Sequence, residues 1–205
     1  MKLVALDLEG SGAQDREDEA ILEIAVVPLQ HRQPDLDAAY STLINPGRPI
    51  PRRRWISPGL TDDVLSSAPS ISDVEPHLAA RINGACLVGH NIGVDWRLLH
   101  RRCPDLAPAG LIDTLRLART IDRKAGNSLS ALVERFALVG EVNRLAQGSV
   151  PHRALWDTIA AALLLPTLAA SVIGRDATDV VLLNAAGTAL SPELIEGDPQ
   201  ATLFD

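Results

Sequence analysis

The stretch that decides the fold is Leu3-Val4-Ala5-Leu6-Asp7-Leu8-Glu9, which runs into the turn residues 10–12, Gly-Ser-Gly. Apolar residues in a short run that stops at glycines predict a buried β-strand ending in a turn. Side chains i and i+2 of a strand point to the same side, so Asp7 and Glu9 converge while Leu6 and Leu8 face the core. Two such carboxylates suit a hard divalent cation, although Asp-x-Glu alone is more often an ordinary strand end.

The surrounding sequence predicts a mixed α/β sheet. Residues 21–29 and 39–44 form two further strands by their apolar content, and the short connections favour an antiparallel meander. Helices and short buried strands then alternate. Their expected ranges are helix 72–82, strand 86–89, helix 94–102, strand 110–112, a helix through 115–118, helix 128–136, a long loop 140–151 and a last helix from about 152 to 173.

Composition bounds the class of protein. A chain of 205 residues with 46% apolar and 22% charged residues is long enough for one α/β domain with a sizeable core. Its net charge of −7 and 3% aromatic residues argue against a histone-like coat and against base-stacking modules. The two cysteines form no Cys-x-x-Cys pair, the N-terminus lacks a signal peptide, and the apolar stretch 159–173 is too short to span a bilayer. We therefore expect a cytoplasmic protein without membrane contact.

Two further polar elements follow buried segments. Gly89-His90-Asn91 ends a short strand, and Asp95 falls in the first turn of the next helix, where an acid is also favoured by the helix dipole. His152 and Asp157 open the last helix. Five residues along a regular helix separate two side chains by about 140°, so this pair converges only if His152 lies in the incoming loop.

Together these elements are specific. Asp-x-Glu on the first strand, Gly-His-Asn-x3-Asp before a central helix and His-x4-Asp before the last one resemble the DEDDh, or DnaQ-like, exonuclease family. This family includes the proofreading epsilon subunit of bacterial DNA polymerase III. Stretches 21–27, 45–51 and 56–61 also resemble family landmarks, and the resemblance covers roughly residues 2–173.

The resemblance implies a ribonuclease H-like fold and phosphodiester hydrolysis with two divalent cations, Mg²⁺ or Mn²⁺. Asp7 would bridge both cations, Glu9 and Asp157 would hold the one beside the nucleophile, and Asp95 would hold the other. His152 would accept the proton of the attacking water. Two cations about 3.5–4 Å apart stabilise the attacking and leaving oxygens, and histidine suits a general base because it titrates near neutrality.

Substrate contacts are expected beside these ligands. The family often has threonines after Asp-x-Glu, whereas this sequence has Gly10, Ser11 and Gly12 there. With His90 and Asn91, these residues are the expected contacts for the 3′ end of the nucleic acid. This difference from the family pattern leaves every expected metal ligand in place, and it affects the expected substrate preference instead.

The chain is expected to divide into a body, residues 1–174, and an acidic tail, residues 175–205, which contains six acids and one arginine. A strand is expected at 180–183. Near the end, Gln200, Leu203 and Phe204 resemble the Gln-x-x-Leu-Phe peptide by which bacterial polymerases and repair proteins dock on the sliding clamp. The alternative is that the tail folds back and buries Leu203 and Phe204 on its own domain.

Three functions are compatible with these patterns. The leading one is a 3′–5′ exonuclease acting on DNA, with single-stranded 3′ ends favoured, that releases nucleoside 5′-monophosphates in proofreading or repair. The second moves the same chemistry to RNA ends or short oligoribonucleotides. The third is a non-catalytic clamp-docking adaptor on an exonuclease scaffold.

Overall fold

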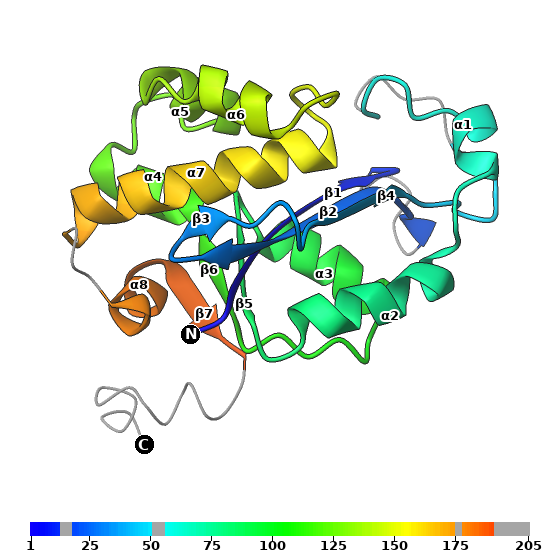
Figure 1. The fold of residues 1–205 in the computed structure, drawn as a ribbon, viewed down its shortest axis with the longest axis horizontal. Helices are drawn as coiled ribbons and strands as arrows, with labels where there is room; N and C mark the ends of the chain where they lie inside the picture. Colours follow the sequence, from blue (N-terminus) through cyan, green and yellow to red (C-terminus); the bar gives the residue numbers. More distant parts are fainter. Residues whose placement is uncertain (13–17, 51–55, 175–177, 191–205) are drawn as a thin grey trace.

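The computed structural model describes residues 1–12, 18–50, 56–174 and 178–190. Its centre is a single seven-stranded sheet with the order β3-β2-β1-β5-β6-β7, in which β4 also pairs with β2 (Figure 1). The strands are β1 (Leu3–Gly10), β2 (Ile21–Gln30), β3 (Gln33–Pro34), β4 (Tyr40–Leu43), β5 (Cys86–Gly89), β6 (Gly110–Asp113) and β7 (Gly187–Ala189). β1 pairs antiparallel with β2 and parallel with β5, and β5 is parallel to β6, which confirms the predicted mixed sheet.

Helices cover both faces of the sheet, as Figure 1 shows. They are α1 (Asp62–Ser66), α2 (Ile71–Ile82), α3 (Gly93–Arg102), α4 (Thr114–Ile121), α5 (Leu129–Arg135), α6 (Val139–Leu145), α7 (Ala154–Val172) and α8 (Asp179–Ala186). Leu3 and Ala5 of β1 pack with the core formed by α4 to α7, whereas Val4 and Leu6 pack with the core formed by α2 and α3. By the strand's period of two, Asp7 and Glu9 therefore lie on the α7 side.

Helix α7 is the central core helix. It is apolar on all sides, and most of its residues are buried between the sheet and α4 to α6. Its length and composition would also allow a membrane span, but 61% of its apolar window is buried within the protein. This burial agrees with the expected core helix.

Two local predictions are wrong. Residues 139–145 form helix α6 inside the expected long loop, and residues 180–183 belong to helix α8 rather than to a strand. In α8, Thr178 caps the helix by accepting the Val181 N–H at 3.3 Å, and Leu182 and Leu183 enter the core. The run Val-Val-Leu-Leu is too short for periodicity to separate a strand from a buried helix.

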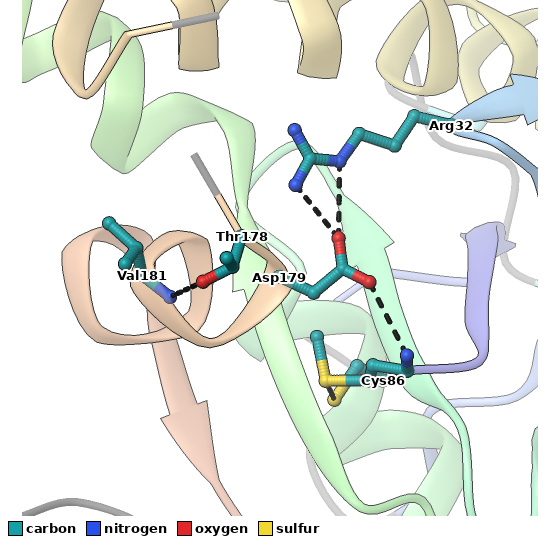
Figure 2. A network of polar contacts seen from close by, with 6 residues as sticks. Arg32, Cys86, Thr178, Asp179 and Val181 are labelled. Carbon is teal, nitrogen blue, oxygen red and sulfur yellow. Dashed lines mark hydrogen bonds and ion pairs between the residues drawn. The ribbon is translucent and has the colours of Figure 1, made fainter. Parts of the chain in front are cut away.

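An ion-pair network fixes α8 against the body (Figure 2). Asp179 Oδ1 accepts hydrogen bonds from Nε and Nη2 of Arg32 at 3.1 and 2.8 Å, and Asp179 Oδ2 lies 3.4 Å from the amino group of Met1. β7 then pairs antiparallel with β6. Residues 178–190, expected within the tail, thus pack on the sheet. The division of the chain at residue 174 stays a prediction, because residues 191–205 lie outside the described ranges.

Candidate active site

The site is built first on the carboxyl end of β1. Asp7 and Glu9 lie opposite Ala25 and Glu23 of β2 in the antiparallel ladder, and the register shifts between Glu9 and Gly10. Such irregularities mark places where a strand changes the direction of its side chains, and they are common next to active sites. The predicted convergence of Asp7 and Glu9 depends on the regular part of β1, in which alternate side chains point to the same side.

The first turn of α7 brings a third carboxylate to the same place. Ligand oxygens of Asp7, Glu9 and Asp157 all lie within 4.8 Å of one another. Carboxylate oxygens are the ligands preferred by Mg²⁺ and Mn²⁺, and these three fit a shared divalent cation by donor type and spacing. Residues 150 positions apart in the chain thus form one candidate metal centre.

His152 lies in the loop before α7, which begins at Ala154, as the five-residue spacing requires. Its backbone N–H donates to Asp157 Oδ1 at 3.3 Å, and its side chain is exposed. Its φ of +65° lies in the left-handed region, which is uncommon for residues other than glycine. The backbone conformation before α7 therefore needs support from its neighbours.

Asp95 approaches from the other side of the sheet, in the first turn of α3. It is outside the three-residue group, but its charge acts on Asp7 and raises the pKa of that carboxyl after the larger effect of burial. Backbone hydrogen bonds at residues 8 and 95 partly offset the burial of Asp95. The four predicted ligands are thus near enough to interact.

The pKa values of these carboxyls are raised first by burial and then by neighbouring acids. Burial, reinforced by the charges of Asp95 and Asp157, raises the pKa of Asp7 well above its usual range. Burial raises the pKa of Glu9 to about 7, that of Asp95 to about 7 and that of Asp157 to about 6. These half-buried acids repel each other, and divalent cations would relieve this repulsion.

These raised pKa values predict how the stability of the metal-free protein depends on pH. The folded protein keeps protons on Glu9, Asp95 and Asp157 up to pH 6–7, whereas unfolded acids lose theirs near pH 4. Stability from these groups is therefore present below about pH 4 and lost as pH rises through 6–7. We expect the Tm in EDTA to fall between pH 5 and pH 8 and added Mn²⁺ to raise it more at pH 8. Thermal scans with and without Mn²⁺ measure this, and a metal effect of equal size at both pH values would contradict it.

The segment before α1 contributes a contact that the sequence did not indicate. The buried hydroxyl of Ser57 donates to Oε2 of Glu9, and this hydrogen bond lowers the pKa of Glu9 against the larger effect of burial. Gly59 has a φ of +87°, and a Cβ there would lie 4.0 Å from Nη1 of Arg153. Residues 57–59 thus lie beside both Glu9 and the beginning of α7.

Two expected substrate contacts, His90 and Asn91, follow β5. The ring of His90 contacts Thr114 Oγ1 at 3.0 Å through Nδ1 and the Asn127 carbonyl oxygen at 2.9 Å through Nε2. Burial lowers its pKa, and because the Asn127 carbonyl oxygen can only accept, Nε2 donates this hydrogen bond. Both nitrogens are engaged within the protein. Asn91 is exposed, with a φ of +67°, and its backbone N–H donates to Asp113 Oδ1 at 2.8 Å.

The other predicted contacts lie after the β1 carboxylates. Ser11 is buried, and its hydroxyl accepts the Ala20 N–H at 2.9 Å, so it holds the turn to β2. A Cβ at Gly10 would lie 3.2 Å from Leu98 Cδ2, which makes the strand end close to α3. Gly12 has a φ of +100°. Contact of these residues with a substrate stays a prediction, and Gln200, Leu203 and Phe204 lie outside the described residues.

Glu23 and Arg153 form an ion pair beside the site. Nε of Arg153 donates to Glu23 Oε2 at 2.7 Å, and Nη2 donates to Oε1 at 3.0 Å. Glu23 is only 6% exposed. The one sequence signal was an acid within an otherwise apolar strand, because 130 residues separate it from its partner.

A mixed sheet that brings three carboxylates together beside its first strand, with Asp95 near enough to act on them, has the composition of a divalent-metal centre. The exonuclease family matches residues 4–165 of this chain. The chain belongs to this exonuclease family, which confirms the resemblance drawn from the motifs. This result weighs against the adaptor interpretation.

The similar proteins include two whose names refer to DNA polymerase III. The chain is 31% identical over 179 residues to a DNA polymerase III subunit epsilon-like protein of Rhodobacter capsulatus, which covers 83% of this chain and 24% of that protein. It is 34% identical over 141 residues to a PolC-type DNA polymerase III of Thermotoga petrophila, covering 66% of this chain and 10% of the polymerase. The chain therefore spans a quarter or less of these relatives.

Solved structures confirm the ribonuclease H-like fold. Exonuclease X in complex with 5′ overhanging duplex DNA is similar with a TM-score of 0.67 and 26% identity, covering 89% of this chain and 98% of that one. The nuclease domain of 3′hExo, described as a DEDDh family member bound to rAMP, has a TM-score of 0.57 and 14% identity, covering 86% of this chain and 94% of that one. The second likeness concerns the fold alone.

Proposed function

We propose that this protein is a divalent-metal-dependent 3′–5′ exonuclease that removes nucleoside 5′-monophosphates from the 3′ end of DNA. The observation that carries the proposal is the convergence of Asp7, Glu9 and Asp157 oxygens within 4.8 Å beside His152. The polymerase names of the relatives and the DNA complex of exonuclease X support DNA as substrate.

The chain's own residues divide the chemistry. Asp7, Glu9, Asp95 and Asp157 would hold two divalent cations, which when bound supply positive charge to the attacking and leaving oxygens. The exposed imidazole of His152 accepts the proton of the attacking water, and the loop before α7 holds it next to Asp157. The 3′ oxygen of the preceding nucleotide leaves, so each cycle releases one nucleoside 5′-monophosphate.

The test uses oligonucleotides of one sequence as DNA and as RNA, labelled at either end, with Mg²⁺ or Mn²⁺. A 3′–5′ exonuclease releases labelled mononucleotide at once from the 3′ label and gives a shortening ladder from the 5′ label. We expect single-stranded DNA to be degraded faster than RNA, and the Asp7→Ala variant to be inactive. Faster RNA degradation would reassign the substrate to RNA ends, and equal behaviour of wild type and Asp7→Ala would refute the enzyme.

A docking partner is also proposed. Gln200, Leu203 and Phe204 match the spacing of a sliding-clamp peptide, and an apolar Leu-Phe pair in an acidic segment suits an apolar groove. Docking would tether the enzyme near DNA in the cytoplasm during proofreading or repair. A peptide of residues 196–205 should bind purified bacterial clamp, and the same peptide with Leu203→Ala and Phe204→Ala should not. Absence of binding at high micromolar concentration would refute docking.

A further inference from the structure

The buried carboxylate of Glu23 has no place among the expected metal ligands, yet it lies directly opposite Glu9 on β2. Both of its oxygens are occupied by the guanidinium of Arg153, and Oε2 also accepts the Ala154 N–H at 3.3 Å. Its ligand atoms are outside the group formed by Asp7, Glu9 and Asp157. Glu23 is thus directed toward the beginning of α7 rather than toward a metal.

The beginning of α7 needs such a partner. The first N–H groups of a helix have no acceptor within the helix, and a side chain at the N-cap usually supplies one. Arg153 is the N-cap of α7, and its guanidinium cannot accept a hydrogen bond. The described structure accordingly shows no hydrogen bond from an N-cap side chain there. Glu23, on strand β2, instead accepts the N–H of Ala154, the first residue of the helix. Its negative charge also suits the positive end of the helix dipole.

Two neighbouring residue pairs of the β1–β2 ladder connect the carboxylates of β1 with α7. Glu9 lies opposite Glu23, which contacts Arg153 and Ala154. Asp7 lies opposite Ala25, whose carbonyl oxygen accepts the Thr158 hydroxyl at 3.3 Å. Strand β2 therefore fixes the first turn of α7, and with it Asp157, relative to the ligands on β1.

The pair is partly buried, with 8% of the Glu23 side chain and 27% of the Arg153 side chain exposed, so desolvation of the carboxylate offsets part of their attraction. Placing Glu23 beside Glu9 and Asp157 adds repulsion, since it contributes to the raised pKa of each after the larger effect of burial. His152 lies directly before Arg153 and contacts Asp157 through its backbone N–H, at a φ of +65° that its surroundings must maintain. Such a pair is explained by the position that it imposes on the loop.

We propose that the Glu23–Arg153 pair positions the loop before α7, so that His152 and Asp157 keep their places relative to Asp7 and Glu9. This inference rests on the proposed function. Glu23 and Arg153 are positioning residues, since they act on the reaction only through His152 and Asp157.

The test uses a substitution for which lost charge and lost position have opposite effects on Mn²⁺ affinity. Arg153→Met removes a positive charge beside a carboxylate cluster, so electrostatics alone predicts tighter Mn²⁺ binding. Loss of position predicts weaker binding, by about 10-fold, with kcat lowered about 10- to 100-fold and KM nearly unchanged. Calorimetric Mn²⁺ titration and steady-state kinetics measure both. The matched control is Arg144→Met, which removes an exposed arginine paired with Glu141 and should change neither quantity.

Two further variants test the positioning role, and the first of them, Arg153→Lys, replaces Arg153→Met if that variant does not fold. Arg153→Lys retains the charge but loses the two-point contact, so electrostatics predicts unchanged Mn²⁺ affinity whereas lost position predicts weaker binding. Glu23→Gln with Arg153→Met should be no worse than Arg153→Met alone, because the residues act as one unit. Tighter or unchanged Mn²⁺ binding together with unchanged kcat in the Arg153 variants refutes the positioning role alone. A wild type that neither hydrolyses nor binds Mn²⁺ better than Asp7→Asn refutes the proposed function, and the positioning role with it.

Discussion

Replacement of Asp7 by asparagine is expected to reduce hydrolysis of a labelled oligonucleotide by about 10³-fold or more, equivalent to about 4 kcal/mol of transition-state stabilisation. Asp7 is the carboxylate on which burial, Asp95 and Asp157 act together, and it belongs to the group with ligand oxygens within 4.8 Å. Loss of a direct ligand should exceed the 10- to 100-fold loss typical of outer-shell residues. Single-turnover rates with saturating Mn²⁺ measure the effect.

The same substitution should make the metal-free protein more stable. It removes the cost of burying a carboxyl whose pKa is raised well above its usual range by burial and by neighbouring acids, and each 1 kcal/mol gained raises the Tm of a chain of this size by about 2–4 °C. The control is Asp105→Asn, which removes an exposed carboxylate from the connection between α3 and β6. It should alter neither rate nor Tm. An inactive and destabilised Asp7→Asn protein would point to misfolding instead of ligand loss.

Replacement of His152 by asparagine is expected to lower kcat by about 10²- to 10⁴-fold, the usual contribution of a general base. Asparagine is the chosen residue because it tolerates the left-handed conformation that His152 adopts at a φ of +65°, and it cannot accept the proton. Mn²⁺ affinity should stay near that of wild type, since His152 contacts Asp157 only through its backbone N–H.

The pH–rate profile separates this role from a structural one. With Mn²⁺ saturating at each pH, the wild-type rate should depend more steeply on pH than the rate of His152→Asn, because the variant has no side chain that accepts the proton. A variant that loses activity but keeps the wild-type pH dependence would show that another group accepts the proton.

Much of the site follows from sequence because it depends on local geometry. The period of two on β1 places Asp7 and Glu9 together, and the angle between helix positions five apart places His152 in a loop. The apolar runs of β1, β5 and α7 are strong enough to fix the layers of the fold.

Contacts between distant residues could not be predicted in this way. Spacing carries no information on the pairing of Glu23 with Arg153 or of Ser57 with Glu9, which depends on how loops return to the sheet. The sequence of helix α6 does not predict a helix, because Gly140 and Asn143 lower helix propensity within a seven-residue segment. The short apolar run of helix α8 fits a strand as well as a helix, although Thr178 followed by Asp179 is a helix-start signal.

The pairing of β7 with β6 has a consequence for the solubility of shortened versions of the chain. An uncovered strand edge presents free backbone groups on which other chains can assemble. β7 occupies that edge of β6, and α8 covers the adjoining apolar surface with Leu182 and Leu183. A fragment cut at residue 174 would offer β6 as a template for association between molecules, so we expect it to aggregate more readily than a chain that keeps residues 178–190.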